Sequence, residues 1–349
     1  MNLYINGRFA TQPLSGVQRF AVEVTRALQA HDPRYTLLTP PGGGADWSSA
    51  REVGTRHGQG WEQLDLPRAA AGGVLFNLGN TGPLWMRRQL VVIHDAGVFS
   101  TPAAYSRKFR IWYKVLQNAL ILRGAAIVTV SEFSRQEILR HLPARSSQVH
   151  VMPEGADHMR RIGTAPEILA EHGLEPGRFV LGVGTLAAHK NLAVLGLLAQ
   201  RLEERGIPLV MAGSMGGEAF QAADKLPQPA RYIGRVSDEQ LKALYEHAGC
   251  FIFPSRYEGF GLPPVEAMAC GCPVVAANIP VMREIGYGAV QFCNPHSPED
   301  VAAQVLAVLD SPARQQELRA AGRARAATLT WARAAATLDG IAKKLFEFR

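Results

Sequence analysis

Short apolar segments alternate with amphipathic helical segments along the first half of the chain. Short apolar runs at Val74 to Phe76, Leu90 to Ile93 and Ala126 to Val130 are typical of parallel strands that are buried on both faces. The chain opens in the same way, with a strand predicted at Asn2 to Gly7 and a helix whose apolar positions recur at helical spacing from Val17 to Leu28. The pattern predicts a doubly wound α/β domain.

The same rhythm restarts in the second half of the chain. Five further strands are predicted, at Phe179 to Val183, Leu209 to Ala212, Tyr232 to Ile233, Cys250 to Phe253 and Pro273 to Ala276. A polar stretch with several prolines and glycines, His158 to Gly177, separates the two halves. We therefore expect two Rossmann-like domains, residues 1–160 and 161–330. Two open parallel sheets that face each other create a cleft, and such folds bind ligands at the carboxyl ends of their strands.

Length and composition agree with two folded domains. The chain has 349 residues, of which 47% are hydrophobic and 19% charged, and this composition excludes a disordered or collagen-like chain. No apolar run reaches the roughly 18 residues that a membrane-spanning helix needs. Polar residues Asn6 to Arg8 stand where a secretory signal would be apolar. We expect a cytoplasmic protein.

The charge of the chain leaves three classes of partner open. With 37 basic and 30 acidic residues the net charge is +7, which suits nucleic acid, an anionic membrane surface or phosphorylated small molecules. One segment, Tyr105 to Arg123, interleaves aromatic residues with the basic residues Arg107, Lys108, Arg110 and Lys114. A basic amphipathic helix of this kind can lie on an anionic membrane. A solvated charged face above a core-facing aromatic row explains the same pattern.

Several absences narrow the chemistry. The sequence has no Asp-x-Asp metal motif, no Walker phosphate loop and no Gly-x-Gly-x-x-Gly after its first strand. These absences weigh against a nucleoside triphosphatase and a nicotinamide-dependent dehydrogenase, and we expect neither a metal nor a cofactor. None of the cysteines forms a Cys-x-x-Cys pair, so we interpret all four as buried thiols: Cys250, Cys270, Cys272 and Cys293.

The densest candidate chemistry lies between Phe251 and Gly271, where the sequence reads FIFPSRYEGFGLPPVEAMACG. A helix is predicted to begin near Pro264, so that free N–H groups at Gly259 to Leu262 and the helix dipole point at one place. Such a place suits a phosphate group. Carboxylates repel phosphate, so Glu258 and Glu266 fit the hydroxyl groups of a sugar or ribose better.

Phosphate-binding groups between two carboxylates favour a nucleotide sugar as ligand. Simpler explanations exist for both glutamates. Glu266 fits a capping residue in a first helical turn, and Glu258 fits an exposed loop charge.

At these residues the sequence resembles the retaining glycosyltransferases of family 4, which have the GT-B fold. Their signature of Glu, seven residues and Glu is matched by Glu258 and Glu266. The resemblance covers nearly the whole chain and includes the segments GVGTLAAHKNL, IGRVSDEQLKALY, VVIHD and TVSEFSRQEI, at Gly182 to Leu192, Ile233 to Tyr245, Val91 to Asp95 and Thr129 to Ile138. It implies an acceptor domain at 1–160, a nucleotide-sugar domain at 161–330, and a last helix at about 331–349 that packs back on the first domain.

The resemblance also implies roles for single residues. It assigns Lys190 to the donor diphosphate and His94 to the transferred sugar, although a solvated lysine and a structural histidine are the ordinary interpretations. Relatives often carry an arginine near this lysine, where this chain has Thr185 and His189. The catalytic candidates are therefore Glu258, His94 and Lys190, and the donor-binding candidates are Gly16, Gly259, Phe260, Gly261, Leu262, Glu266, Arg256, Val236 and Asp238.

The implied activity is transfer of a hexose from a nucleoside diphosphate sugar to a hydroxyl acceptor with retention of configuration and without a metal. An aspartate near the base, Asp238, accepts hydrogen bonds from guanine, which favours GDP-mannose over a UDP-hexose. The expected acceptor is a glycan or a lipid-linked glycan of bacterial cell-surface polysaccharide, made at the inner face of the membrane, and no nucleic acid is expected. A nucleotide-sugar epimerase with the same fold and a non-catalytic nucleotide-sugar-binding protein remain as alternatives.

Overall fold

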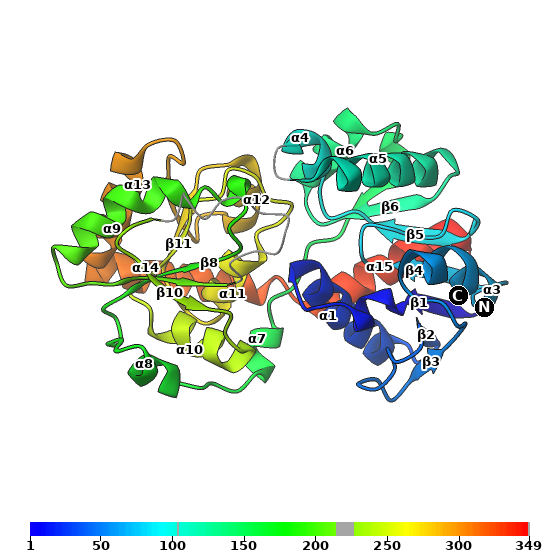
Figure 1. The fold of residues 1–349 in the computed structure, drawn as a ribbon, viewed down its shortest axis with the longest axis horizontal. Coiled ribbons are helices and arrows are strands. Elements are labelled where there is room, and N and C mark those ends of the chain that lie inside the picture. The colour runs from blue at the N-terminus through cyan, green and yellow to red at the C-terminus, as the bar shows by residue number, and fades with distance from the viewer. Residues whose placement is uncertain (103–104, 214–226, 348–349) are drawn as a thin grey trace. The chain divides into compact units, whose positions relative to one another are not determined.

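The chain folds into two compact units, seen in a computed structural model that describes residues 1–102, 105–213 and 227–347 (Figure 1). The first unit comprises Met1–Ser100, Arg107–Gly155 and Trp331–Arg349. The second comprises Thr101–Ser106 and Ala156–Thr330. The first unit is therefore discontinuous in sequence.

The first unit is built on a parallel sheet of seven strands within the described residues, in the order β3-β2-β1-β4-β5-β6-β7. The strands are β1 (Leu3–Asn6), β2 (Tyr35–Thr39), β3 (Ala50–Glu52), β4 (Val74–Asn77), β5 (Gln89–Val92), β6 (Ala126–Thr129) and β7 (Val149–Val151). The helices are α1 (Gly16–His31), α2 (Gly58–Gly60), α3 (Leu66–Ala69), α4 (Gly97–Ser100), α5 (Arg107–Leu122), α6 (Glu132–His141) and α15 (Trp331–Phe346), with short turns η1 (Gly7–Thr11), η2 (Trp61–Asp65) and η4 (Ser146–Gln148).

The second unit has a parallel sheet of six described strands in the order β10-β9-β8-β11-β12-β13. The strands are β8 (Val180–Val183), β9 (Leu209–Ala212), β10 (Arg231–Gly234), β11 (Cys250–Phe253), β12 (Val274–Ala277) and β13 (Gln291–Cys293). The helices are α7 (His158–Arg161), α8 (Glu167–Glu171), α9 (Gly196–Glu203), α10 (Asp238–His247), α11 (Leu262–Ala269), α12 (Pro280–Gly286), α13 (Pro298–Leu309) and α14 (Pro312–Ala327), with turns η5 (Ala188–Lys190) and η6 (Leu192–Leu195).

The predicted α/β class with two parallel sheets is confirmed, and every predicted strand is present with ends that agree to within one residue. The sequence analysis missed β2, β3, β7 and β13. The last three are three residues long and lie at sheet edges. An edge strand has one neighbour and little apolar surface to bury, so β3 (ARE) and β13 (QFC) lack a readable apolar run.

Each sheet is covered by helices that bury an aliphatic core. In the first unit α5 contributes Leu116 and Leu120 to a buried cluster with Val91 and Ile127. In the second unit helix α9 packs Leu198 and other aliphatic residues against the sheet. Fully burying one such side chain stabilises the fold by about 1.5–3 kcal/mol.

The last helix, α15, packs on α1 of the first unit. Figure 1 shows α15 in red beside α1 in blue. The ring of Trp331 stands edge-on to Phe20 with ring centroids 5.9 Å apart. Further along α15, Asp339 accepts a hydrogen bond of 2.8 Å from the Tyr35 hydroxyl and pairs with Lys343 at 2.8 Å. Aromatic packing and a buried polar contact thus fix the helix to the start of the chain.

The burial of the cysteines agrees largely with the prediction of buried thiols. Cys250, Cys272 and Cys293 are buried as predicted, whereas Cys270 is only half-buried. Burial raises the pKa of the Cys250 thiol to about 12, which keeps it protonated and unreactive.

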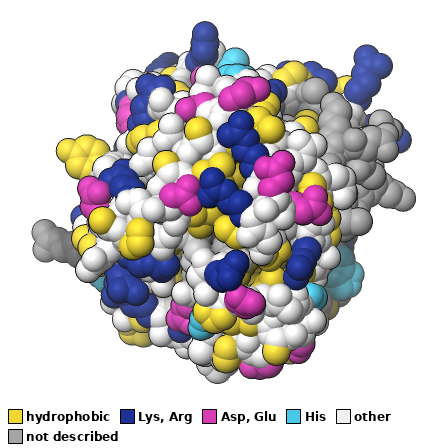
Figure 2. Space-filling view, turned by 90° about the vertical axis from the view of Figure 1, so that its left-hand side faces the viewer, with side chains coloured by type: hydrophobic (Ala, Val, Ile, Leu, Met, Phe, Trp, Pro, Cys, Tyr) yellow, Lys and Arg dark blue, Asp and Glu magenta, His cyan; other side chains and the backbone are white. Residues whose placement is uncertain are grey.

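On the face of the second unit shown in Figure 2, basic and acidic side chains are interspersed. Among the described residues no helix is long and apolar enough to cross a bilayer.

Candidate functional site

In the second unit, two loops that follow neighbouring strands are tied together. The side-chain amide of Asn191, after β8, donates hydrogen bonds to the carbonyls of Pro254 (3.1 Å) and Pro295 (2.8 Å). The backbone N–H of Arg256, after β11, donates to the carbonyl of His189 at 2.9 Å. Asn191 adopts a left-handed conformation with φ 56°, which asparagine tolerates better than most residues. The loops therefore present their side chains at one end of the sheet.

These loops bring together two of the predicted catalytic residues, Lys190 and Glu258. The Lys190 ammonium lies 2.7 Å from a Glu258 carboxylate oxygen, and the two side chains are 16% and 13% exposed. The ammonium also lies 5.3 Å from the ring centroid of Phe253, close enough for a cation–π contact. The pair is mostly buried but keeps some exposure to solvent, so each charge can exchange its partner for a ligand group.

The start of α11 presents backbone donors rather than side chains. Gly261, just before the helix, has φ 95°, and a Cβ there would lie 2.8 Å from Cε of Met282. No side chain among the described residues caps this helix start. Pro263 and Pro264 lack an N–H group, so the donors of this region lie at Gly259 to Leu262. Phe260 and Leu262 are buried, and those predicted residues can meet a ligand mainly through their main chain.

Glu266 is buried and held by two partners that the sequence did not indicate. Nε2 of His158 lies 3.1 Å from Oε1 of Glu266, and the Tyr245 hydroxyl donates to Oε2 at 3.4 Å. Burial, reinforced by the neighbouring Glu266, raises the pKa of Tyr245 well above its ordinary value, so its hydroxyl remains a donor. Glu266 is the fifth residue of α11. The alternative of a capping residue in the first turn is therefore wrong.

The remaining donor-binding candidates lie after β10, after β11 and at the start of α1. Val236 and Asp238 lie after β10, where Ser237 and Gln240 cap α10 and Asp238 is its first residue. A carboxylate there is favoured by the helix dipole. The Arg256 side chain is exposed on the same loop as Glu258. Gly16, in the first unit, is the first residue of α1, and a Cβ there would meet no atom within 4 Å, so packing within the unit does not require a glycine.

In the first unit His94 lies just beyond β5, as predicted, and both ring nitrogens have partners. Nε2 lies 3.1 Å from the carbonyl of Leu78, and Nδ1 lies 3.3 Å from a carboxylate oxygen of Glu154. The ring is buried and stands edge-on to Phe20, with centroids 4.5 Å apart. A neutral imidazole has one N–H and can donate to only one of these oxygens. The histidine is thus firmly oriented by its own unit.

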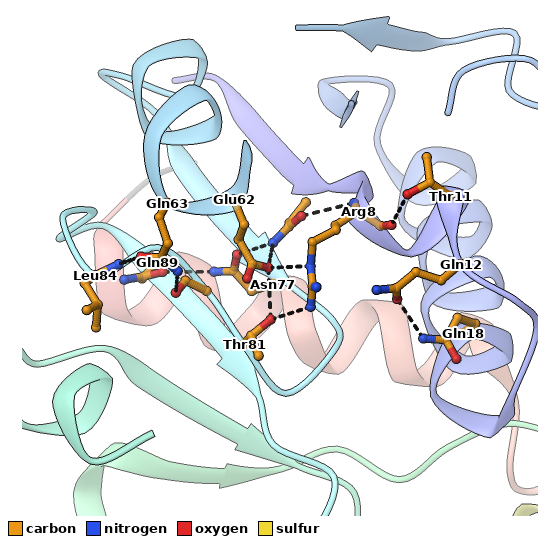
Figure 3. Close-up of polar contacts among 12 residues, drawn as sticks. Arg8, Thr11, Gln12, Gln18, Glu62, Gln63, Asn77, Thr81, Leu84 and Gln89 are labelled. Carbon is orange, nitrogen blue, oxygen red and sulfur yellow. Dashed lines mark hydrogen bonds and ion pairs between the residues drawn. The ribbon is translucent and has the colours of Figure 1, made fainter. Parts of the chain in front are cut away.

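A buried polar group beside these residues escaped the sequence analysis. We call it the Glu62 cluster, and it consists of Asn6, Arg8, Glu62, Asn77 and Thr81. Figure 3 labels the last four of these residues. One carboxylate oxygen of Glu62 accepts from Asn6 (2.8 Å) and Thr81 (2.9 Å) and pairs with Arg8 (3.2 Å). Asn6 and Asn77 end the neighbouring strands β1 and β4 and are linked at 2.9 Å. The sequence signals were an Asn at the end of the first strand and an Arg two residues later, but nothing pointed to Glu62.

One surface pocket lies apart from the predicted residues. A surface pocket lined by Ile207, Pro208 and Pro229 opens at the amino ends of β9 and β10, whereas the predicted residues lie at carboxyl ends. Within the described residues, no three His, Cys, Asp or Glu side chains gather closely enough to hold a metal ion.

Comparison with known proteins identifies similar chains. Residues 165–325 match the family model for glycosyl transferases group 1. O-antigen chain mannosyltransferase B of Escherichia coli is 32% identical over 263 residues, which cover 71% of this chain and 68% of that protein. Serotype-specific mannosyltransferase WbdA of Escherichia coli is 30% identical over 61% of this chain, but the match spans only 28% of that longer protein.

The fold also has close structural neighbours. HepE of Anabaena, solved in complex with UDP and glucose, superposes with a TM-score of 0.74 at 17% sequence identity, and the match covers 100% of both chains. This likeness shows the GT-B fold.

Proposed function

Because the chain belongs to the group 1 glycosyltransferases, we propose that it transfers a hexose from a nucleoside diphosphate sugar to a glycan hydroxyl, with retention of configuration, in the synthesis of a bacterial cell-surface polysaccharide. The observation that carries this proposal is the Lys190–Glu258 pair, 2.7 Å apart beside the start of α11. A cation, backbone N–H donors and a carboxylate at one place fit a sugar diphosphate.

Charge development during transfer gives each group a role. Cleavage of the bond to the anomeric carbon makes the diphosphate oxygens more negative. Lys190, the N–H groups at Gly259 to Leu262 and the dipole of α11 would stabilise that charge, and one such donor is typically worth about 10²–10³ in rate. Glu258 would then accept hydrogen bonds from the sugar hydroxyls. In this scheme the protein's own groups neutralise the leaving group, so a metal ion is not required.

The ribose and the base would bind nearby. Glu266 is proposed to accept from the ribose hydroxyls, and His158 and Tyr245 act as positioning residues that fix its carboxylate. The loop after β10, with Val236 and Asp238, is proposed to flank the base. Arg256, on the loop of Glu258, is the candidate for a second cation at the diphosphate.

His94 and Gly16 are proposed to contribute from the first unit. Both nitrogens of His94 already face oxygens, those of Leu78 and Glu154. Contact between the ring and the transferred sugar therefore requires that one of these hydrogen bonds be exchanged for a sugar hydroxyl. Gly16 is proposed to lie near the donor phosphates, where the exposed, side-chain-free start of α1 gives access to its backbone.

GDP-mannose is the favoured donor. The names of the two Escherichia coli relatives specify mannosyl transfer, and Asp238 can accept from the two N–H groups of guanine. The complex of HepE with UDP and glucose keeps a UDP-hexose as the alternative donor.

Product analysis tests the proposal. The purified protein is incubated with labelled GDP-mannose or UDP-glucose, with and without a mannose-terminated oligosaccharide, in the presence of EDTA. We expect a new glycan with the donor's anomeric configuration, formed only with acceptor and unaffected by EDTA. Isomerised donor without acceptor would establish the epimerase. Selective stabilisation by a nucleotide sugar without turnover would establish the binding protein.

A further inference from the structure

Helix α5 has two apolar faces, and within the described residues one is buried and the other exposed. Leu116, Leu120 and Ile121 are buried in the core of the first unit. On the opposite side Ile111, Val115 and Leu122 are 63%, 61% and 72% exposed. These positions are spaced by four and seven residues, so they share one helical face. A surface helix ordinarily presents polar residues there.

Aromatic side chains widen this exposed stripe. Trp112, on α5, is exposed, and Trp85, in the loop between β4 and β5, is 72% exposed. The two parts are joined through Arg123, whose guanidinium lies 4.7 Å from the Trp85 ring centroid and whose Nε donates to the carbonyl of Leu84 at 2.6 Å. We call the patch of Trp85, Ile111, Trp112, Val115 and Leu122 the α5 face. Contiguous exposed apolar groups of this kind mark interaction sites.

The charged residues on α5 and in the loop that carries Trp85 are all basic. Arg107 and Lys108 are exposed at the start of the helix, Arg123 lies at its end, and Arg87 and Arg88 are exposed beside Trp85. The sequence has no Asp or Glu between residues 96 and 131. The face of the second unit in Figure 2, by contrast, carries both signs.

The structure corrects the prediction of which basic and aromatic residues of this helix are exposed. Lys114 is half-buried, with its ammonium 4.8 Å from the ring centroid of Phe99. Tyr113 is half-buried and stacks on Phe109 at 4.2 Å. Arg110 is also half-buried. Of the four predicted basic residues, Arg107 and Lys108 remain as exposed cations, and the apolar partners are aliphatic residues and tryptophans.

We propose that the α5 face docks on an anionic lipid bilayer. Tryptophan and aliphatic side chains favour the boundary between headgroups and acyl chains, and flanking Lys and Arg residues are attracted to anionic headgroups. The complementary charge selects lipid over an apolar protein surface. Docking would bring the enzyme to a lipid-linked acceptor at the membrane. Only this link to an acceptor rests on the proposed function.

Vesicle sedimentation tests the docking. The full chain is mixed with vesicles of phosphatidylcholine alone or with 30 mol% phosphatidylglycerol (about one charge in three lipids, enough for a strongly negative surface), at low and high salt. We expect binding to the anionic vesicles at low salt, at least about tenfold weaker binding at high salt because the charges are screened, and little binding to phosphatidylcholine.

Three variants separate the causes. R107Q/K108Q/R123Q removes cations, I111Q/V115Q/L122Q removes the exposed apolar groups, and R178Q/R201Q/R205Q removes the same charge from exposed positions of the second unit. We expect the first two to lose at least about tenfold in vesicle affinity, and the control to bind as the wild type does. Circular dichroism and thermal melting check that each variant folds.

Several outcomes would overturn the proposal. These are absence of wild-type binding to anionic vesicles, an equal loss in the control variant, and unchanged binding by the apolar variant. A wild-type dimer that I111Q/V115Q/L122Q converts to monomer would instead assign the face to a second copy of the chain. Transfer to a soluble acceptor is measured in parallel. Docking without transfer leaves this inference intact and refutes the proposed function, and transfer without docking does the reverse.

Discussion

The loops after β8 and β11 in the second unit and the Glu62 cluster in the first unit occupy corresponding places, because both lie at carboxyl ends of neighbouring parallel strands. They are assembled differently. Lys190 and Glu258 each sit in one short continuous segment that directly follows its strand. In the Glu62 cluster, Glu62 is 56 residues from Asn6 and 19 from Thr81. The loops of Lys190 and Glu258 are thus local motifs, whereas the Glu62 cluster is a network of residues that are distant in sequence.

The two places also differ in how completely their charges are satisfied. Glu62 is 1% exposed, and one of its carboxylate oxygens accepts hydrogen bonds from Asn6 and Thr81 and forms an ion pair with Arg8. Among the described residues Glu258 pairs with Lys190, and its side chain is 13% exposed. A fully buried charge that loses its partner costs more stability than a partly exposed one, and a partly exposed pair can exchange its contact for a ligand. We therefore expect the first place to support the fold and the second to support activity.

The strongest test of this difference is Glu62→Ala. The substitution leaves the Arg8 guanidinium largely buried without its carboxylate, and removes the acceptor of Asn6 and Thr81. We expect the free energy of unfolding to fall by about 3–5 kcal/mol, measured by urea denaturation. Glu317→Ala is the control, because Glu317 pairs with Arg314 at 2.7 Å but is exposed, and its loss should cost less than about 1 kcal/mol. Equal effects would mean that the Glu62 cluster does not support the fold.

Glu258→Ala should show the opposite pattern. We expect transfer to fall about 10²-fold or more, because a contact made in the transition state is lost. The free energy of unfolding should fall by about 1–2 kcal/mol, less than in Glu62→Ala, because the Glu258 side chain is more exposed than that of Glu62. Initial rates and urea denaturation of the same preparation give both values. Wild-type turnover by the folded variant would remove Glu258 from the proposed site.

Lys190 variants sharpen the assignment of the cation. Lys190→Ala should weaken donor binding about tenfold, or about 1.4 kcal/mol, and should also slow transfer. Lys190→Arg should recover only part of this loss, since a planar guanidinium differs in shape from an ammonium. Calorimetric titration of GDP measures the binding. Unchanged GDP affinity in Lys190→Ala would separate this lysine from the diphosphate.

The smallest expected effect is a pH dependence confined to the first unit. Burial would raise the pKa of Asp339, but hydrogen bonds from Lys343 and Tyr35 outweigh it and lower the pKa below its ordinary value of 3.8. The ionised carboxylate therefore adds stability above that value, and the contribution is lost as the pH falls through the lowered pKa. Asp339→Asn should be about 1 kcal/mol less stable at pH 7, and this difference should vanish in strong acid. A difference that is constant with pH in thermal melts would contradict this account.

The sequence was most informative where candidate residues directly follow a strand. The apolar run Cys250 to Phe253 and the glycines after it located β11, its loop and the start of α11, and Lys190 was placed by the same logic. The partners of Glu266 were not predictable, because His158 lies 108 residues away and Tyr245 sits on another helix. Glu62 was missed for the same reason. Contacts of this kind depend on tertiary packing, which local spacing does not encode.

The placement of α15 in the first unit has a consequence for the order in which the protein is made. A ribosome releases the segment Ala156–Thr330 in full before Trp331 emerges. The second unit can therefore complete its core during synthesis, while Phe20 and Tyr35, made before it, still lack the Trp331 and Asp339 side chains that pack against them. The first unit thus matures after the second, and during that interval its unfinished core is exposed to proteases and to chaperones that bind apolar surface.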